Sequence, residues 1–131
     1  MNNEARLRLL TANTHEVEAN SDKRTVSLTN DMDPLEWKDA IAGAERVELN
    51  FPQFTDGRAY SQAYLIRRRL RFTGDLRAVG EVLVDQLIQL ERVGFSSAVL
   101  QDDVDLAQAQ QHLDRFPAFY QGDVLRTAPF A

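Results

Sequence analysis

The stretch GDLRAVGEVLVDQLIQLERVGFSSAVL, residues 74–100, contains the pattern that decides the fold. Residues 75–80 and residues 95–100 are short apolar runs of the kind that forms strands. Between them, leucines recur at helical spacing, and Gly94 is suited to end that helix. The leucines are Leu83, Leu87 and Leu90. A strand, a helix and another strand in this order predict a right-handed crossover between two parallel strands.

The same alternation extends in both directions from this stretch. Strands are predicted over 25–29, 45–52, 75–80 and 95–100, and helices over 33–43, 61–71, 81–94 and 102–116. This order predicts a single α/β domain over residues 1–131, with a mainly parallel sheet that is either open or half-barrel-like. An exposed half-barrel edge would favour a homodimer.

Capping residues and alternating residue types predict where the first helices and strands lie. Asp33 can cap a helix whose first turn holds Pro34, and Ser61 can cap the next helix. Residues 6–11 alternate arginine with leucine, which predicts a half-buried edge strand. The polar residues 12–24 predict a loop.

Composition excludes several classes of protein. The chain has a formal net charge of −5 and a pI near 5.0, which argues against non-specific nucleic-acid binding. It has no cysteine, so it forms no disulfide, thiolate nucleophile or cysteine-ligated cluster. Its two histidines, His15 and His112, are far apart in sequence, so we expect surface residues and no metal site.

Targeting signals are also missing from the sequence. No apolar run approaches the roughly 20 residues that span a bilayer. The first ten residues, MNNEARLRLL, lack the basic head and long apolar core of a signal peptide. We therefore expect a cytoplasmic protein without a membrane partner.

Residues 54–80 concentrate arginine in an otherwise acidic chain. The six arginines are Arg58, Arg67, Arg68, Arg69, Arg71 and Arg77. The three consecutive ones point in different directions on a helix, so we expect them to be solvated. Arg58, in a turn, and Arg77, in a short strand, are explained either by an anionic ligand or by a structural salt bridge. The candidate salt-bridge partners are Asp56, Asp75, Glu81 and Asp85.

Ligands of parallel α/β sheets gather at the edge where strands end and helices begin. The loop 52–61 reaches that edge, and Asp56–Gly57 permits a tight turn before a helix N-terminus that favours anions. The candidate ligand-binding residues are Asp56, Arg58, Tyr60, Ser61, Arg77, Glu81, Asp85 and Gln86. Packing, helix capping and helix–helix hydrogen bonds would equally explain several of them. The glycine-rich nucleotide motifs are missing, so the cofactor stays unknown.

The segments FTDGR, YS, GDLRAVG and VDQL occur together in this chain, and FYQ follows at 119–121. In these segments residues 26–121 resemble a bacterial family of unknown biochemical function. Its members are described as oxidoreductases of sulfite reduction, because they are commonly encoded beside sulfite reductase. Many of them have cysteine where this chain has Val93, so thiol chemistry is excluded at that position here.

The resemblance implies a function in sulfate assimilation but gives no residue a role. The leading hypothesis is an accessory protein of sulfite reduction that binds a small oxyanion, sulfite reductase, or both. The alternative is an oxidoreductase that uses a flavin or nicotinamide cofactor. A structural subunit without a ligand of its own is a third possibility.

Overall fold

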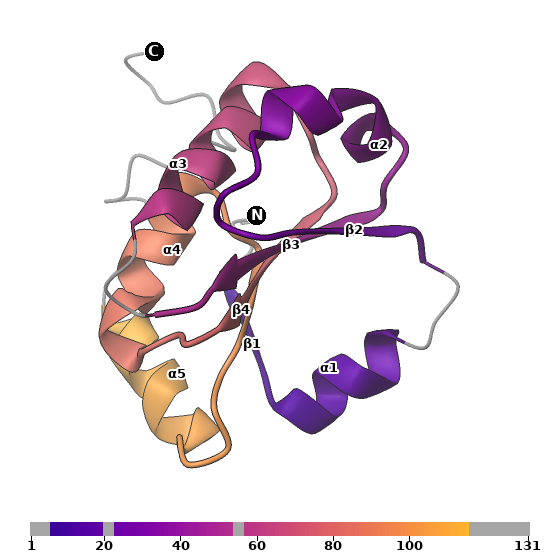
Figure 1. The fold of residues 1–131 in the computed structure, drawn as a ribbon. Coiled ribbons are helices and arrows are strands. Elements are labelled where there is room, and N and C mark those ends of the chain that lie inside the picture. The colour runs from indigo at the N-terminus through magenta and orange to yellow at the C-terminus, as the bar shows by residue number, and fades with distance from the viewer. Residues whose placement is uncertain (1–5, 20–22, 54–56, 116–131) are drawn as a thin grey trace, which may run out of the picture.

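The computed structural model describes residues 6–19, 23–53 and 57–115, which form an open sheet of parallel strands with the order β1-β5-β4-β3-β2 (Figure 1). The strands are β1 (Arg8–Leu10), β2 (Thr25–Leu28), β3 (Arg46–Phe51), β4 (Asp75–Gly80) and β5 (Ser97–Val99). The helices are α1 (Ala12–Ala19), α2 (Lys38–Ala42), α3 (Arg58–Tyr64), α4 (Leu87–Val93) and α5 (Leu106–Asp114). Short helical turns adjoin them: the 3₁₀ turns η1 (Pro34–Trp37) and η3 (Val84–Gln86), and the π-helical turn η2 (Leu65–Arg69). The predicted single α/β domain is confirmed.

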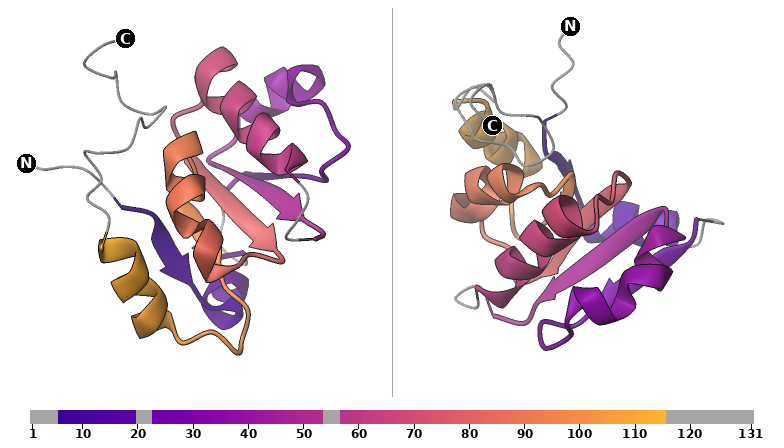
Figure 2. Two further views of the ribbon diagram at one scale, coloured as in Figure 1. Left: turned by 90° about the vertical axis from the view of Figure 1, so that its left-hand side faces the viewer. Right: turned by 90° about the horizontal axis from the view of Figure 1, so that it is seen from above.

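The strand order explains where the helices lie. From β2 to β5 each new strand joins the same side of the sheet, and right-handed crossovers then place the connecting helices on one face. Figure 2 shows α3, α4 and α5 together on that face, called here the first face. Between β1 and β2 the chain crosses from one edge of the sheet to the other. This direction is opposite to the one in which β3, β4 and β5 are added. The crossover that contains α1 therefore runs over the second face (Figure 1).

The first face carries the apolar core. Val47, Leu49 and Phe51 alternate along β3 toward this face, as the spacing by two predicts, and all are buried. They pack with apolar side chains of the helices and of β4 in one cluster, which includes Ala63, Ile66, Leu76, Leu87 and Leu90. The spacing of Leu106, Ala109 and Leu113 predicts an apolar stripe on the last helix, and Ala109 and Leu113 of α5 are buried.

The second face is polar along its central strands. The alternate residues of β3 and β4 point to it, and they include Arg46, Glu48, Asp75 and Arg77. Parallel strands that are covered on both faces are usually apolar throughout. Here the side chains of one face are charged, so the contacts that α1 makes with this face are polar.

The loop predicted over 12–24 is wrong for its first part, because residues 12–19 form α1. Thr11 caps this helix, since its Oγ1 accepts a hydrogen bond from the Thr14 backbone N–H at 3.1 Å. Helix α1 has no buried residue, and its apolar residues do not follow a helical period. The usual sequence signal for a helix is therefore missing.

Two predicted helix starts are also wrong. Ser61 is not a cap: α3 already begins at Arg58, after Gly57, and Ser61 lies inside the helix. The helix after β4 begins with the turn η3 rather than at residue 81, and Leu83 precedes that turn with its side chain exposed. Asp33 caps η1 as predicted, by accepting from the Leu35 N–H, and Gly94 ends α4 with φ 110°.

No helix among the described residues is long and apolar enough to cross a membrane. Cytoplasmic location stays a prediction.

Gly80, the last residue of β4, holds a backbone conformation that other residues adopt at a cost. Its φ is +96°, and a Cβ there would lie 2.4 Å from the Phe51 carbonyl oxygen. We expect Gly80→Ala to lower the free energy of unfolding by about 1–3 kcal/mol, through backbone strain and this clash. Urea denaturation measures the change. Gly43→Ala is the control, since the nearest atom to a Cβ there lies at 3.9 Å; an equal loss in both variants would contradict the explanation.

Candidate functional site

Of the predicted rim residues that the structure describes, all except Arg77 lie near the carboxyl ends of β3 and β4. Arg58 is exposed at the start of α3, and its charge contributes to lowering the pKa of Asp31, after hydrogen bonds from Thr29 and from the Asp31 backbone. Ser61, Glu81 and Asp85 are exposed. Asp56 lies outside the described residues.

The rim brings Tyr60 and Gln86 together. The Tyr60 ring packs edge-on against Phe51, with 5.4 Å between the ring centroids. Burial raises the pKa of the Tyr60 hydroxyl, and a hydrogen bond with Gln86 partly opposes that rise. The Gln86 Oε1 atom also accepts from the Leu83 backbone N–H at 2.8 Å. These contacts serve packing and capping, and a ligand role at the rim stays a prediction.

Arg77 does not join the rim, because its side chain points to the second face and is 0% exposed. Its guanidinium donates to Ser97 Oγ at 2.9 Å, Asp75 Oδ2 at 2.9 Å and Glu18 Oε1 at 2.7 Å. The salt bridge to Asp75, which the sequence left open, is therefore present. A fourth contact, 3.0 Å to His15 Nδ1, requires that nitrogen to accept, because arginine has no acceptor.

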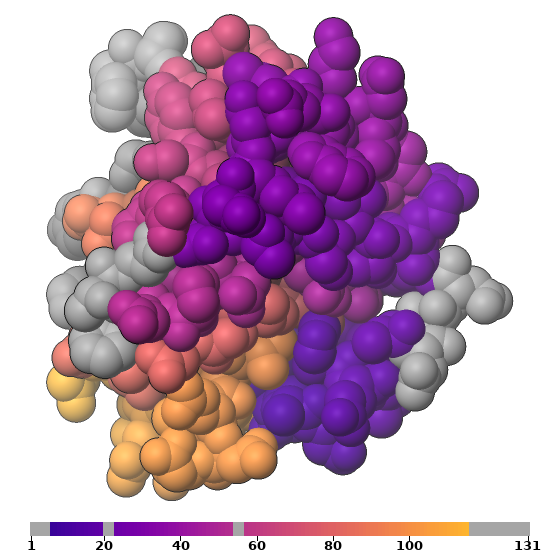
Figure 3. Space-filling view, viewed as in Figure 1, coloured from indigo at the N-terminus to yellow at the C-terminus, as the bar shows by residue number. Residues whose placement is uncertain are grey.

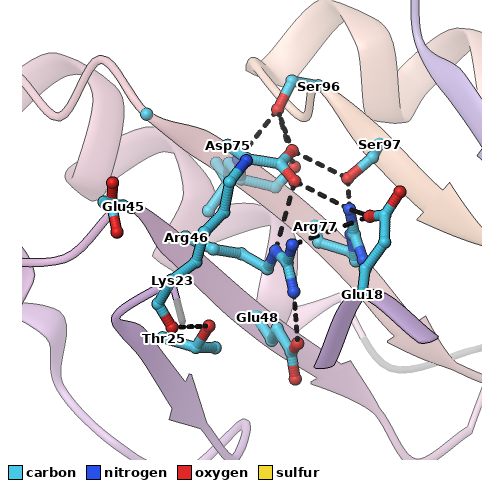
Figure 4. Close-up of polar contacts among 12 residues, drawn as sticks. Glu18, Lys23, Thr25, Glu45, Arg46, Glu48, Asp75, Arg77, Ser96 and Ser97 are labelled. Atoms are coloured by element: carbon cyan, nitrogen blue, oxygen red, sulfur yellow. Dashed lines mark hydrogen bonds and ion pairs between the residues drawn. The ribbon is translucent and has the colours of Figure 1, made fainter. Parts of the chain in front are cut away.

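Asp75 connects the arginines to the neighbouring strand β5. Its Oδ1 accepts from Ser96 Oγ at 2.6 Å and from Ser97 Oγ at 2.8 Å, as Figure 4 shows. Burial alone would raise the pKa of Asp75, but these hydrogen bonds and the charges of Arg77 and Arg46 together lower it. Asp75 is thus a fixed anion of the second face.

Three arginines surround the carboxylate of Glu18, which α1 holds over the second face. We call Arg8, Arg46 and Arg77 the arginine cluster. Arg77 donates to Oε1, Arg46 Nη2 lies 3.6 Å from the same oxygen, and Arg8 contacts Oε2. Hydrogen bonds from Arg77 and then Arg8 lower the pKa of Glu18 from its ordinary 4.5 to about 2. Glu18 is therefore ionised in any physiological buffer.

The consecutive arginines differ in environment. Arg68 and Arg69 are exposed, as predicted, but the prediction is wrong for Arg67, which is 4% exposed. Arg67 donates to three carbonyl oxygens, those of Gly94 at 2.8 Å, Phe72 at 2.9 Å and Gly74 at 2.8 Å. It thereby fixes the loop between η2 and β4 against the end of α4.

A second candidate site is a groove of about 1130 Å³ at the amino ends of the strands. We call it the basic groove. Its cationic lining residues are Arg6, Arg8, Lys23, Lys38, Arg69 and Arg71, and its acidic ones are Asp39, Glu45 and Asp75. Apolar residues such as Ile41, Leu70 and Phe72 complete the lining. Two of the six cations, Arg6 and Arg8, pair with Glu91 and Glu18, which do not line the groove. The other cations, in a chain of net charge −5, favour an anionic ligand.

The sequence reasoning missed Glu18, Arg46 and Glu48, as well as the basic groove. A signal for part of the second face was available, because β3 carries a polar residue at every second position: Arg46, Glu48 and Asn50. No signal predicted that Glu18 would reach this face, since its segment was interpreted as a loop.

No group of three or more histidine, cysteine, aspartate or glutamate side chains suited to a metal ion occurs within residues 6–19, 23–53 and 57–115. A flavin or nicotinamide cofactor, a homodimer and the absence of nucleic acid stay predictions.

The pKa of Glu18 gives a pH-dependent prediction. A folded-state pKa below the ordinary value means that ionised Glu18 stabilises the fold above pH 4.5, and that this contribution is lost as the pH falls toward 2. We expect the difference in free energy of unfolding between wild type and Glu18→Gln to be constant from pH 7 to 5 and to shrink below 4.5. Urea titrations at successive pH values measure it. A difference that does not change down to pH 2.5 would contradict the ion pairs.

Comparison with known proteins adds the family. No curated protein matches the chain. A solved structure, the nicotinate-nucleotide pyrophosphorylase from Francisella tularensis, is similar with 16% sequence identity and a TM-score of 0.43. The match covers 76% of this chain and 36% of that chain, so this chain spans about a third of that protein, and the likeness carries no argument about function. The family model described as "Bacterial protein of unknown function (DUF934)" matches residues 25–131, and the chain therefore belongs to this family.

Proposed function

We propose that this protein is an accessory protein of sulfite reduction, which docks on sulfite reductase through the basic groove and binds a small oxyanion. The link to sulfite reduction rests on the resemblance of its motifs to proteins encoded beside sulfite reductase. The docking proposal rests on the exposed cations in the groove whose side chains have no partner among the described residues.

Three exposed cations of the groove are available to a partner. The side chains of Lys38, Arg69 and Arg71 make no hydrogen bond or ion pair with any described residue. Two of the three acidic lining residues are engaged elsewhere. Asp75 is held by Ser96 and Ser97, and Glu45 Oε1 accepts from the Arg24 backbone N–H at 3.1 Å. The groove therefore presents positive charge to an acidic segment of another protein.

Arg71 supports a role for the guanidinium itself. Its φ is +59°, the left-handed region, and within the described chain no other residue except glycine has a positive φ. The helical turn η2 ends at Arg69 with Leu70 as its C-cap, and glycine is the usual residue at the position that follows such a cap. Arginine there keeps a side chain at a backbone cost of about 1–2 kcal/mol. Because Arg71 lines the groove, its guanidinium can contact an acidic partner there.

Arg71→Gly separates docking from stability. We expect the variant to gain up to about 1 kcal/mol in free energy of unfolding, because the backbone strain is relieved. We expect its affinity for the source organism's sulfite reductase to fall, with binding that also weakens as salt rises. Pull-down and biolayer interferometry measure the affinity, and urea denaturation measures the stability.

Arg92→Ala is the matched control, because Arg92 is exposed on α4 outside the groove. It should bind sulfite reductase like the wild type. A stabilised Arg71→Gly protein that binds sulfite reductase as tightly as the wild type would show that the groove is not the docking surface.

The rim offers one place for the oxyanion, and Arg58→Ala tests it. If Arg58 binds the anion, titration calorimetry with sulfite or sulfate should show a loss of about ten- to a hundredfold in affinity, the value of a charge-assisted hydrogen bond. The denaturation midpoint should stay unchanged, because the side chain is exposed. Unchanged affinity would place the oxyanion away from the rim.

A further inference from the structure

We propose that the arginine cluster on the second face is itself an anion-binding site, and that Glu18 occupies it as a tethered substitute for the ligand. Helix α1 is then a displaceable cover over the site. This inference rests on the proposed binding of a small oxyanion and assigns that oxyanion a place that the sequence did not predict. The rim takes no part in it, and the basic groove shares only Arg8 and Asp75 with this site.

The contacts of Glu18 are those that an anionic ligand would make. Both of its carboxylate oxygens face arginine, with Arg77 and Arg46 near Oε1 and Arg8 at Oε2. Figure 4 shows the Glu18 carboxylate beside Arg77. Guanidinium groups from three different strands converge on one carboxylate, which is the arrangement that favours oxyanions.

Arg46 has hydrogen-bonding capacity that Glu18 does not use. The side chain is 2% exposed, yet its Nε and Nη1 atoms make no hydrogen bond with any described residue. The nearest carboxylate oxygens are 3.5 Å from Nε, on Asp75, and 3.9 Å from Nη1, on Glu48. Buried donors without acceptors are unfavourable. An anion with three or four oxygens would have acceptors left for Arg46 after replacing both oxygens of Glu18, so the ligand class is a small oxyanion such as sulfite, sulfate or phosphate.

The charges of the second face require one anion at this place. Without Glu18, the three arginines of the cluster face two carboxylates, those of Glu48 and Asp75. The charge left without a carboxylate is then that of the exposed Arg8, beside the almost fully buried guanidinium groups of Arg46 and Arg77. A singly charged oxyanion, such as hydrogensulfite or dihydrogenphosphate, restores the balance, and it cannot occupy the site together with the Glu18 carboxylate. Ligand and α1 therefore compete.

Polar side chains, rather than buried apolar ones, hold helix α1 on the sheet. The helix has no buried residue, and Val17 is 65% exposed. An isolated helix of this length is marginal in water, so α1 depends on its contacts with the sheet. Those contacts are polar and run through His15 and Glu18. Figure 3 shows α1 as an outlying lobe of the surface, in indigo at the lower right. Its release leaves the apolar core of the first face in place.

Glu18→Gln tests the competition, because the amide keeps the shape of the side chain and removes its charge. Titration calorimetry with sulfite, sulfate, phosphate and acetate measures the affinity of wild type and variant. We expect the variant to bind the oxyanions at least about tenfold more tightly than the wild type, because the competing carboxylate no longer holds the site. Acetate, with two oxygens, should gain less. Which of the other three binds best identifies the oxyanion.

Glu16→Gln is the matched control, since Glu16 is an exposed acidic residue of the same helix and makes no contact with the arginines. It should bind like the wild type. Adding Arg8→Ala to Glu18→Gln should reverse most of the gain, because it removes one arginine of the cluster. Hydrogen exchange tests the displacement of α1 in the wild-type protein, without any variant. We expect saturating sulfite to speed the exchange of the α1 amide hydrogens.

Three other results would contradict the inference, and each of them would identify a different error in it. If wild type and Glu18→Gln bind sulfite equally, oxyanion binding stands but lies elsewhere, and Glu18 is not a competitor. If neither protein binds any of the four anions, oxyanion binding itself is wrong, while docking on sulfite reductase is still judged by Arg71→Gly. Slower exchange of the α1 amides with sulfite would show that the ligand does not displace the helix.

Discussion

The buried charge of Arg77 is the constraint on which the second face depends. A guanidinium that is 0% exposed must have acceptors and counter-charges within reach, because an unpaired buried cation is strongly unfavourable. Asp75 and Ser97 provide part of this from the sheet itself. The rest comes from α1, through Glu18 and His15. The position of α1 is therefore an electrostatic requirement rather than a consequence of apolar packing.

The two faces of the sheet have different roles: the first stabilises the fold, and the second holds the candidate anion site. The first face holds the leucine, isoleucine and phenylalanine side chains that stabilise the domain, and the helices α3 and α4 pack on it. On the second face, Arg8, Arg46 and Arg77 pair with the carboxylates of Glu18, Glu48 and Asp75. Arg67 is a structural arginine, because it donates hydrogen bonds to three carbonyl oxygens and thereby fixes a loop. Arg46 leaves two donors unused at the centre of the second face. This difference separates a structural arginine from a candidate ligand-binding one.

The candidate site was only partly predictable. The sequence singled out Arg77 and offered Asp75 as its partner, and the structure contains that pair. It grouped Arg77 with Arg58, however, although the first points to the second face and the other stands at the start of α3. Side chains alternate along β4, so Leu76 and Ala78 face the core while Arg77 points to the second face, whereas α3 packs on the first face. Glu18 was missed because polar residues without a helical period carry no sign that they form a helix.

The sequence by itself determined the α/β class, the parallel order of elements from residue 25 onward and the apolar face of β3, because each follows from local spacing of apolar residues and from glycines that end helices. It also excluded cysteine chemistry. Only the tertiary structure decided which charged residues meet. Glu18, Arg46 and Arg77 come from three separate segments, and they converge because the crossover from β1 to β2 takes the chain back across the sheet on the face that the other helices leave open.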